Sequence, residues 1–121
     1  KFAKTKFPFF SKKISPFNSQ NTLISRNVIK DYFLYPHVGR MDDIWASFYV
    51  TSKKYKVVYN EPTVYQERNV HNLIKDFKDE YIGYVNSLNL VENLYKDPEN
   101  IYFFLPKKSS LAFDEWRKLI K

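Results

Sequence analysis

The clearest pattern in the chain is a run of apolar and aromatic residues that recur every three or four positions between Val70 and Leu88. Its members are Val70, Leu73, Ile74, Phe77, Tyr81, Tyr84, Val85 and Leu88. This spacing matches the turn of an α-helix and predicts one helix with an apolar stripe. Charged residues such as Lys75 and Lys78 fall largely off the stripe, and Asn69 is the expected N-cap.

Shorter patterns predict the other elements. From Asp43 onward, apolar residues at helical spacing indicate a second helix. Short strands are expected at 55–59 and 63–66, on either side of the sequence Asn-Glu-Pro, and a buried strand at 101–105. Residues 109–121 predict a terminal helix opened by the second serine of a Ser-Ser pair, with acidic residues early and basic residues late. The chain is therefore expected to have an α/β or α+β fold, with short strands and three to four helices.

The first 15 residues, 1–15, form a basic and aromatic arm. Its lysines and phenylalanines are interleaved: Lys1, Phe2, Lys4, Lys6, Phe7, Phe9, Phe10, Lys12 and Lys13. Such a surface can stack the bases of nucleic acid. Because Pro8 and Pro16 break regular structure, the favoured interpretation is an extended arm that packs its aromatic residues on the body. Residues 16–121 are then expected to form a single domain.

Composition narrows the classes of function. The chain has 121 residues, of which 44% are hydrophobic, enough for one packed core. Two glycines are too few for a phosphate-cradling loop, and the lack of cysteine excludes disulfides, thiolate zinc sites and a cysteine nucleophile. The net charge of +7 favours acidic partners such as nucleic acid or a sugar nucleotide's diphosphate. No apolar run approaches the roughly 20 residues of a membrane span, and composition leaves the compartment open.

Three polar clusters occur at turns or helix entrances, at residues 18–22, 40–43 and 66–72. In a small domain such entrances can meet at one cleft. The adjacent Asp42 and Asp43 allow three interpretations, of which ligation of a metal ion is the least favoured. A helix cap or a surface ion pair needs no special function. A carboxylate beside a cleft can instead bind a hydroxyl group and take its proton.

The order of the polar motifs resembles the C-terminal half of STELLO-type glycosyltransferase-like proteins. The matching pieces are PFNSQNT at 16–22, R-x-x-DIW at 40–45, V-x-Q-x-RN-x-H at 64–71 and DF-x-x-E at 76–80. The resemblance implies the acceptor-side portion of a GT-A-like fold, whose Rossmann-like N-terminal half binds a nucleotide sugar. Because the chain has neither a preceding βαβ half nor a D-x-D motif, it is expected to be inactive as an isolated fragment.

The resemblance also implies roles for individual residues. Asp43 is the leading candidate for the group that contacts the acceptor and, in inverting enzymes, deprotonates its hydroxyl; Asp42 is the second. The substrate-binding candidates are Arg40, Trp45, Asn18, Gln20, Asn21, Arg68 and Asn69. His71 is the candidate ligand of a divalent cation, Mn²⁺ or Mg²⁺, in the full-length protein. The implied partners are a nucleotide-sugar donor and a hydroxyl acceptor, and the implied compartment is the Golgi lumen.

Each of these roles has a structural alternative. Arg40 and Arg68 can pair with Asp43 or Glu67 instead of binding phosphate. Helical spacing favours core packing for Trp45 over stacking on a sugar. Asparagine and glutamine at turns often bond their own backbone, and a histidine near a helix start is often a polar surface residue. The alternative function is a non-catalytic basic aromatic module that binds nucleic acid or a protein partner.

Overall fold

The computed structural model of the protein describes residues 6–11, 13–67, 70 and 72–120. Its helices are α1 (Asp42–Ser52), α2 (Leu73–Lys96) and α3 (Lys107–Leu119), with two 3-10 helices, η1 (Gly39–Met41) and η2 (Pro98–Phe103). The strands β1 (Phe9–Phe10) and β2 (Val58–Tyr59) form a small antiparallel sheet. Of the two expected fold classes, the described residues have the α+β one.

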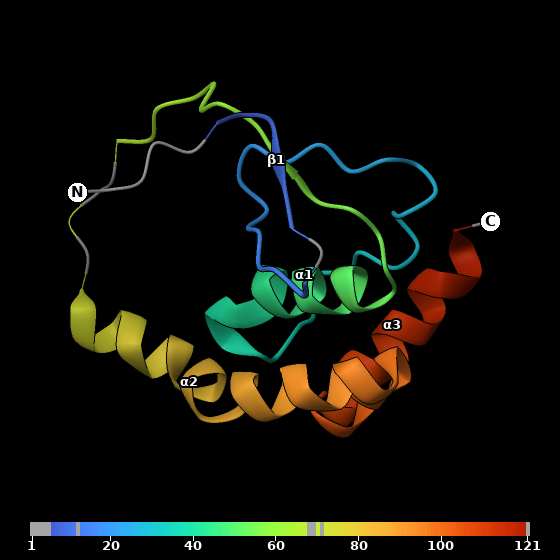
Figure 1. Ribbon diagram of the computed structural model, residues 1–121. Coiled ribbons are helices and arrows are strands. Elements are labelled where there is room, and N and C mark those ends of the chain that lie inside the picture. The colour runs from blue at the N-terminus through green and yellow to red at the C-terminus, as the bar shows by residue number, and fades with distance from the viewer. Residues whose placement is uncertain (1–5, 12, 68–69, 71, 121) are drawn as a thin grey trace.

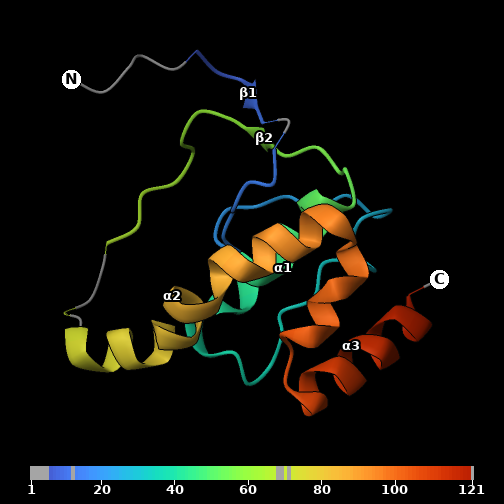
Figure 2. The same cartoon turned by 60° about the horizontal axis from the view of Figure 1, so that its bottom comes forward.

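The elements are arranged around α1, which lies at the centre of the molecule with α2 below it and the small sheet above (Figure 1). In the view turned so that the bottom comes forward, α2 crosses in front of α1 (Figure 2). From the end of α2, η2 leads to α3. The sheet joins the N-terminal arm to the segment that follows α1. Phe9 lies opposite Tyr59, with the ring centroids 5.9 Å apart. Phe9 of the arm thus contacts Tyr59, while Phe9 and Phe10 both remain about half exposed.

The core is largely aromatic and centres on Phe113 of α3. Its ring centroid lies 5.3 Å from those of both Tyr35 and Tyr49, each in an edge-to-face arrangement that aromatic pairs prefer. Phe33 stacks on the same ring at 5.6 Å. The buried hydrophobic residues around it include Val38, Trp45, Ala46, Leu90, Leu94, Ile101 and Leu105. The core therefore joins all three α-helices to the segment that precedes η1.

The helix predicted from Asp43 is confirmed. It is α1, which begins at Asp42, one residue before the predicted start. The strand expected at 55–59 is confirmed only for its last two residues, Val58 and Tyr59. The strand expected at 63–66 is wrong, since those residues are exposed and form no ladder. A strand needs a hydrogen-bonded neighbour, and the arm pairs with β2 instead.

The buried strand expected at 101–105 is also wrong, because the chain coils there as η2. Asp97 caps this 3-10 helix by accepting a hydrogen bond from the Glu99 backbone N–H at 2.9 Å, and Pro98 occupies its first turn. Ile101 and Leu105 are nevertheless buried. A short apolar run indicates burial without distinguishing strand from helix.

The predicted long and terminal helices exist with different boundaries. Asn72, not Asn69, caps α2 by accepting a hydrogen bond from the Lys75 backbone N–H at 3.1 Å. Asn69 itself lies outside the described residues. The terminal helix α3 begins at Lys107, directly after a proline, so Ser110 lies inside it rather than at its cap.

Most of the predicted apolar stripe of α2 faces solvent. Leu73, Ile74, Phe77, Tyr81, Tyr84, Val85 and Leu88 are each between 57% and 83% exposed. The buried residues of α2 are Gly83, Leu90 and Leu94, which lie on the opposite side of the helix. The helix is therefore amphipathic as predicted, but it packs on the body through the other face.

Gly39 sets how closely η1 approaches α2. Its φ of 63° lies in the left-handed region that glycine adopts without steric cost. A Cβ at this position would overlap the backbone carbonyl oxygen of Asp79 in α2. A side chain here would therefore strain the turn and push two packed elements apart.

We expect Gly39→Ala to lower the free energy of unfolding by about 1–3 kcal/mol, because the left-handed backbone and the overlap with Asp79 both disfavour alanine. Gly83→Ala is the matched control. Its Cβ would overlap three atoms of the Met41 side chain, which must move, but a side chain moves more readily than the Asp79 backbone. Because alanine also gains about 1 kcal/mol of helix propensity, the loss should be smaller than for Gly39→Ala. Urea denaturation of both variants measures the difference. Equal losses would contradict the close approach at Gly39.

Candidate functional site

The turn at residues 18–22 is held against the start of α1 by Asp43. The Asp43 Oδ2 atom accepts hydrogen bonds from the Ser19 backbone N–H at 2.8 Å and from the Ser19 hydroxyl at 3.1 Å. Asp42 Oδ1 accepts a hydrogen bond from the Asp43 backbone N–H at 2.9 Å. Met41, at the N-cap position of α1, makes no side-chain cap. Asp43 therefore anchors a distant turn, and two of the three polar clusters meet in space.

A second link ties the same turn to the segment after β2. The Asn21 side-chain amide donates to Thr63 Oγ1 at 3.0 Å, and the Thr63 hydroxyl lies 3.4 Å from Asn21 Oδ1. Asn21 has a φ of 51°, a left-handed conformation that asparagine tolerates better than most residues. The Thr22 hydroxyl donates to the Asn18 carbonyl at 2.7 Å and closes the turn. The turn is thus held at both sides by side-chain hydrogen bonds.

The surface between this turn and residues 55–63 is hollowed into a cleft of about 880 Å³. Its polar lining includes Asn18, Gln20, Asn21, Asn60, Glu61 and Thr63. Ile44 and Val50 of α1 contribute apolar lining. This volume and mixture of groups are within the range of sites for small molecules. We refer to this hollow as the turn cleft.

Tyr32 lies beside the acidic pair at the start of α1. Its pKa is raised to about 12, first by burial and then by the negative charges of Asp43 and Asp42. Its hydroxyl has no hydrogen-bonding partner among the described residues. Its ring stacks on Phe17, with the centroids 5.5 Å apart. The sequence offers no signal that separates this tyrosine from the other nine.

The remaining predicted site residues lie elsewhere. Trp45 is fully buried and donates its indole N–H to Ser87 at 3.1 Å, so it is a core residue and offers no face to a sugar. Arg40 forms ion pairs with Asp76 at 2.5 Å and Glu80 at 3.3 Å, both on α2. It therefore takes a structural role, with different partners from those expected. Arg68, Asn69 and His71 lie outside the described residues.

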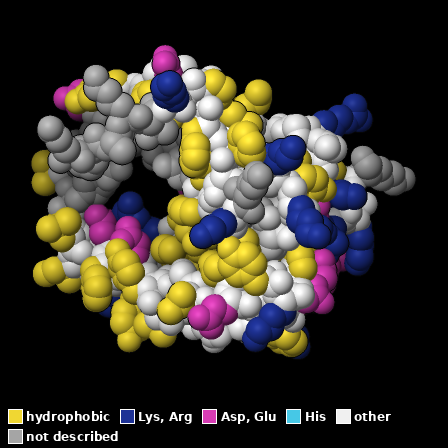
Figure 3. Space-filling model, viewed as in Figure 1, with side chains coloured by type: hydrophobic (Ala, Val, Ile, Leu, Met, Phe, Trp, Pro, Cys, Tyr) yellow, Lys and Arg dark blue, Asp and Glu magenta, His cyan; other side chains and the backbone are white. Residues whose placement is uncertain are grey.

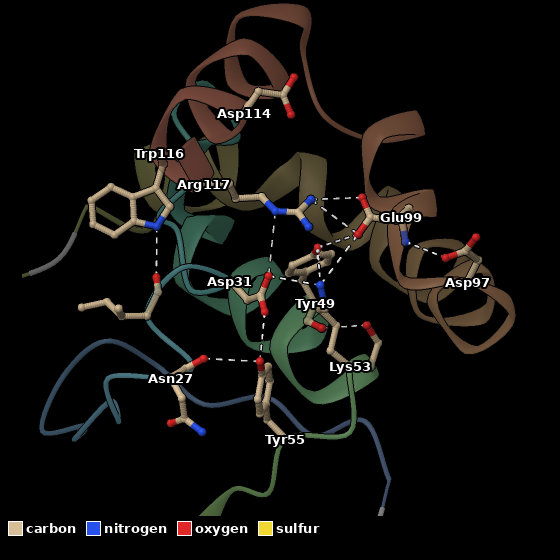
Figure 4. Close-up of polar contacts among 12 residues, drawn as sticks. Asn27, Asp31, Tyr49, Lys53, Tyr55, Asp97, Glu99, Asp114, Trp116 and Arg117 are labelled. Atoms are coloured by element: carbon tan, nitrogen blue, oxygen red, sulfur yellow. Dashed lines mark hydrogen bonds and ion pairs between the residues drawn. The ribbon is translucent and has the colours of Figure 1, made fainter. Parts of the chain in front are cut away.

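A separate cluster of charged residues surrounds Asp31, near the other end of α1 (Figure 4). The Asp31 side chain is only 1% exposed. Its Oδ1 atom lies 3.2 Å from Lys53 Nζ and 4.0 Å from Arg117 Nε. Its Oδ2 atom accepts a hydrogen bond from the Tyr55 hydroxyl at 3.2 Å. Two cations and a phenol thus compensate one buried carboxylate.

Glu99 of η2 completes this cluster. It lies 3.2 Å from Arg117 Nη1 and 3.8 Å from Lys53 Nζ. It also accepts a hydrogen bond from the Tyr49 hydroxyl at 2.9 Å, and burial together with this carboxylate raises the pKa of Tyr49 above its usual range. The cluster, which we call the Asp31 clamp, joins the segment before η1 to α1, η2 and α3. With Asp31 buried and its two oxygens engaged, its role is structural.

No local pattern in the sequence reveals the Asp31 clamp. Its acidic members are isolated in sequence, and Asp31 and Arg117 are separated by most of the chain. No short motif or spacing links them. The only local signal is a charged residue, Asp31, set among the apolar and aromatic residues Val28, Ile29, Tyr32 and Phe33.

The described part of the chain has neither a cluster of metal-ligating side chains nor a helix suited to span a membrane. No group of three or more His, Cys, Asp or Glu side chains there could hold a metal ion. Among the same residues, no helix has the length and apolar character to span a bilayer. Comparison with family models, with curated proteins and with solved structures gives no match to this chain.

We expect Asp31→Asn to lower the free energy of unfolding by about 1.5–3 kcal/mol, because Lys53 and Arg117 lose their buried counter-charge and keep only the half-exposed Glu99. Glu115→Gln is the matched control, since Glu115 pairs with Lys118 at 2.7 Å while both side chains are more than two-thirds exposed. An exposed pair contributes at most about 1 kcal/mol. Thermal and urea denaturation measure both. Similar small losses would show that the clamp is not a structural centre.

Proposed function

We propose that this chain is the acceptor-side portion of a glycosyltransferase, which transfers a sugar from a nucleotide-sugar donor to a hydroxyl group of an acceptor. The observation that carries the proposal is the turn cleft. Asn18, Gln20, Asn21 and Thr63 line the cleft, and Asn21 is bonded to Thr63. Asp43 is not itself a lining residue but is joined to the same turn through Ser19. The turn and Asp43 belong to motifs on which the resemblance rests.

The lining of the turn cleft suits a carbohydrate. Sugar hydroxyls both donate and accept hydrogen bonds, and the amides of asparagine and glutamine can do the same from one side chain. Glu61 adds a carboxylate acceptor, and Ile44 and Val50 offer apolar contact for C–H groups. Such a cleft would bind the acceptor rather than a diphosphate, because the described lining includes only one cationic side chain, Lys56.

Asp43 is the residue that we assign to the acceptor hydroxyl. Its Oδ2 atom is fixed by Ser19, which holds the carboxylate in one orientation. Its Oδ1 atom accepts no hydrogen bond from the described residues, and so remains able to accept one. In an inverting transfer the acceptor oxygen would attack the anomeric carbon, the bond to the diphosphate would break, and the hydroxyl proton would pass to the carboxylate. Asp42, adjacent in sequence, is the second candidate.

The donor side of the reaction would lie in other parts of a longer protein. A nucleotide diphosphate leaves with negative charge, which Mn²⁺ or Mg²⁺ commonly compensates in such enzymes. His71 is the residue of this chain that the proposal assigns to that cation. It remains an assignment from the resemblance alone.

The first test is acceptor binding by this chain. We expect monosaccharides and short oligosaccharides, titrated at millimolar concentration, to shift the amide NMR signals of Gln20, Asn21 and Asn60. Asn21→Ala should remove the effect, because it deletes both the link to Thr63 and a lining amide. Asn89→Ala on α2 is the control, because Asn89 is exposed and is not among the residues that line the cleft.

The sugar titration, together with a titration of an oligonucleotide, distinguishes the transferase proposal from the alternative function of a nucleic-acid-binding module. Phe7, Phe9 and Phe10 are between 41% and 51% exposed, and lysines lie nearby in sequence, so the arm could bind single-stranded nucleic acid. Binding of this kind weakens steeply with salt. Salt-sensitive binding of an oligonucleotide, with no response to sugars at the turn cleft, would favour a non-catalytic module and contradict the transferase proposal.

The second test concerns catalysis in the longer protein. Asp43→Asn should lower the turnover rate by on the order of 10²–10⁴-fold, because an amide cannot take up the hydroxyl proton. Asn can still accept the hydrogen bonds of Ser19, so stability should fall by only about 1 kcal/mol. The affinity for the donor should be unchanged. Steady-state rates and donor titration measure the two quantities.

Asp42→Asn is the matched control for this test and should have the smaller effect on turnover. Near-normal turnover of Asp43→Asn would remove the assignment of Asp43 as the base. A loss of donor affinity equal to the loss of turnover would instead point to a role with the diphosphate or its metal. Ser19→Ala provides a further check, since it removes one of the two bonds that orient Asp43 but keeps the carboxylate.

A further inference from the structure

The exposed face of α2 has a regular apolar seam. Its members, which we call the α2 seam, are Ile74, Phe77, Tyr81, Tyr84, Leu88, Val91 and Tyr95. The spacing between them alternates strictly between three and four residues. All except Val91 are between 57% and 83% exposed. In the space-filling view, hydrophobic side chains gather along the lower left edge, where α2 begins (Figure 3).

This spacing is that of the core positions in a coiled coil, and it indicates a helix as the partner. Soluble proteins rarely expose so long a continuous apolar strip unless it is an interaction site. The charges beside the strip are of both signs, with Lys78 and Glu92 on the same flank and both exposed. A balanced flank does not suit an anionic membrane or nucleic acid, which would select for bases alone.

We propose that the α2 seam pairs with the α2 seam of a second copy of this chain, in an antiparallel two-helix interface about a two-fold axis near Val85. The charges on the flank select this arrangement. When the helices are antiparallel and Val85 faces Val85 of the second copy, Lys78 faces Glu92 of the second copy. The symmetry repeats the pair, so each dimer gains two complementary contacts.

Other arrangements of the same two helices lack this match. In a parallel pairing, the residues that flank the seam would place Lys78 beside Leu73 and Glu92 beside Ser87 of the second copy. In the antiparallel pairing shifted by one heptad, Lys78 would face Val85. Neither arrangement forms an ion pair on this flank. The complementarity therefore specifies both the direction and the register.

The proposed register also places large side chains against each other. Phe77 would pack against Tyr95 of the second copy, Tyr81 against Val91, and Tyr84 against Leu88. With large side chains removing about 150–250 Å² each when fully buried, the exposed fractions of these residues amount to roughly 500–800 Å² per copy. A standard protein interface buries about 800 Å² per partner. The seam is thus large enough for a dimer.

The decisive experiment is a charge exchange followed by sedimentation equilibrium from micromolar to millimolar concentration. We expect the unaltered chain to dimerise. Lys78→Glu should raise the dimer dissociation constant by about tenfold or more, because it sets two pairs of like charges opposite each other. The double variant Lys78→Glu with Glu92→Lys should restore the dissociation constant to within about threefold of the original.

Because the chain contains no cysteine, a single introduced cysteine reports the register. Val85→Cys should form a covalent dimer under mild oxidation, since the two copies of residue 85 meet at the axis. Tyr95→Cys is the matched control, because the two copies of residue 95 would lie near opposite ends of the interface, about 25–30 Å apart at 1.5 Å per residue. Circular dichroism of each variant verifies that α2 remains folded.

The outcomes distinguish this proposal from other uses of the seam. A chain that stays monomeric at millimolar concentration would overturn the proposal, whether or not it binds a lipid vesicle or another protein. A dimer that is indifferent to Lys78→Glu, or that cross-links equally through Tyr95→Cys, would overturn the antiparallel register. The inference does not rest on sugar transfer, and the acceptor titration at the turn cleft would be unaffected by either result.

Discussion

The arrangement of the described chain depends on the compensation of one buried charge, the carboxylate of Asp31. An ionised carboxylate excluded from water is strongly unfavourable unless cations and hydrogen bonds replace its hydration. Lys53 comes from just beyond the end of α1 and Arg117 from α3, so satisfying Asp31 fixes both elements against the segment that precedes η1. Glu99 shares the same two cations and adds η2 to the group. The aromatic core around Phe113 then packs inside the frame that these contacts define.

The two ends of α1 illustrate how environment decides the role of a carboxylate. Near its end, Lys53 compensates Asp31, whose oxygens are engaged and inaccessible. At its start, Asp43 is only partly buried and uses one oxygen to hold Ser19. Because α1 connects these two ends, it cannot shift without disturbing the Asp31 clamp. Its residues Ile44 and Val50 therefore form a fixed wall of the turn cleft. The proposed acceptor site thus lies on a scaffold whose position is set at the opposite end of the same helix.

Local patterns in the sequence predicted those features that local physics controls. The 3.6-residue period identified α1 and α2, and the acids at the start of α1 indicated its first turn. The same reasoning missed the coil of η2, since an apolar run such as 101–105 specifies burial alone. It also missed the Asp31 clamp, whose members come together only through tertiary folding. Of the site, the meeting of residues 18–22 with Asp43 was anticipated from the position of both clusters at turns or helix entrances, whereas the contact of Asn21 with Thr63 was not.

The apolar stripe of α2 shows why amphipathicity does not reveal which face a domain buries. The face that packs on the body includes Gly83, against Met41, and Ser87, which accepts the indole N–H of Trp45. Small residues permit close approach, so α2 packs on the rest of the domain through its less apolar face. Its large apolar side chains therefore remain exposed. A helix that has large aliphatic or aromatic residues at every seam position and buries a glycine on its other face is consistent with two interfaces, one within the chain and one beyond it. The turn cleft shares no lining residue with the α2 seam, so occupation of the seam leaves the cleft accessible.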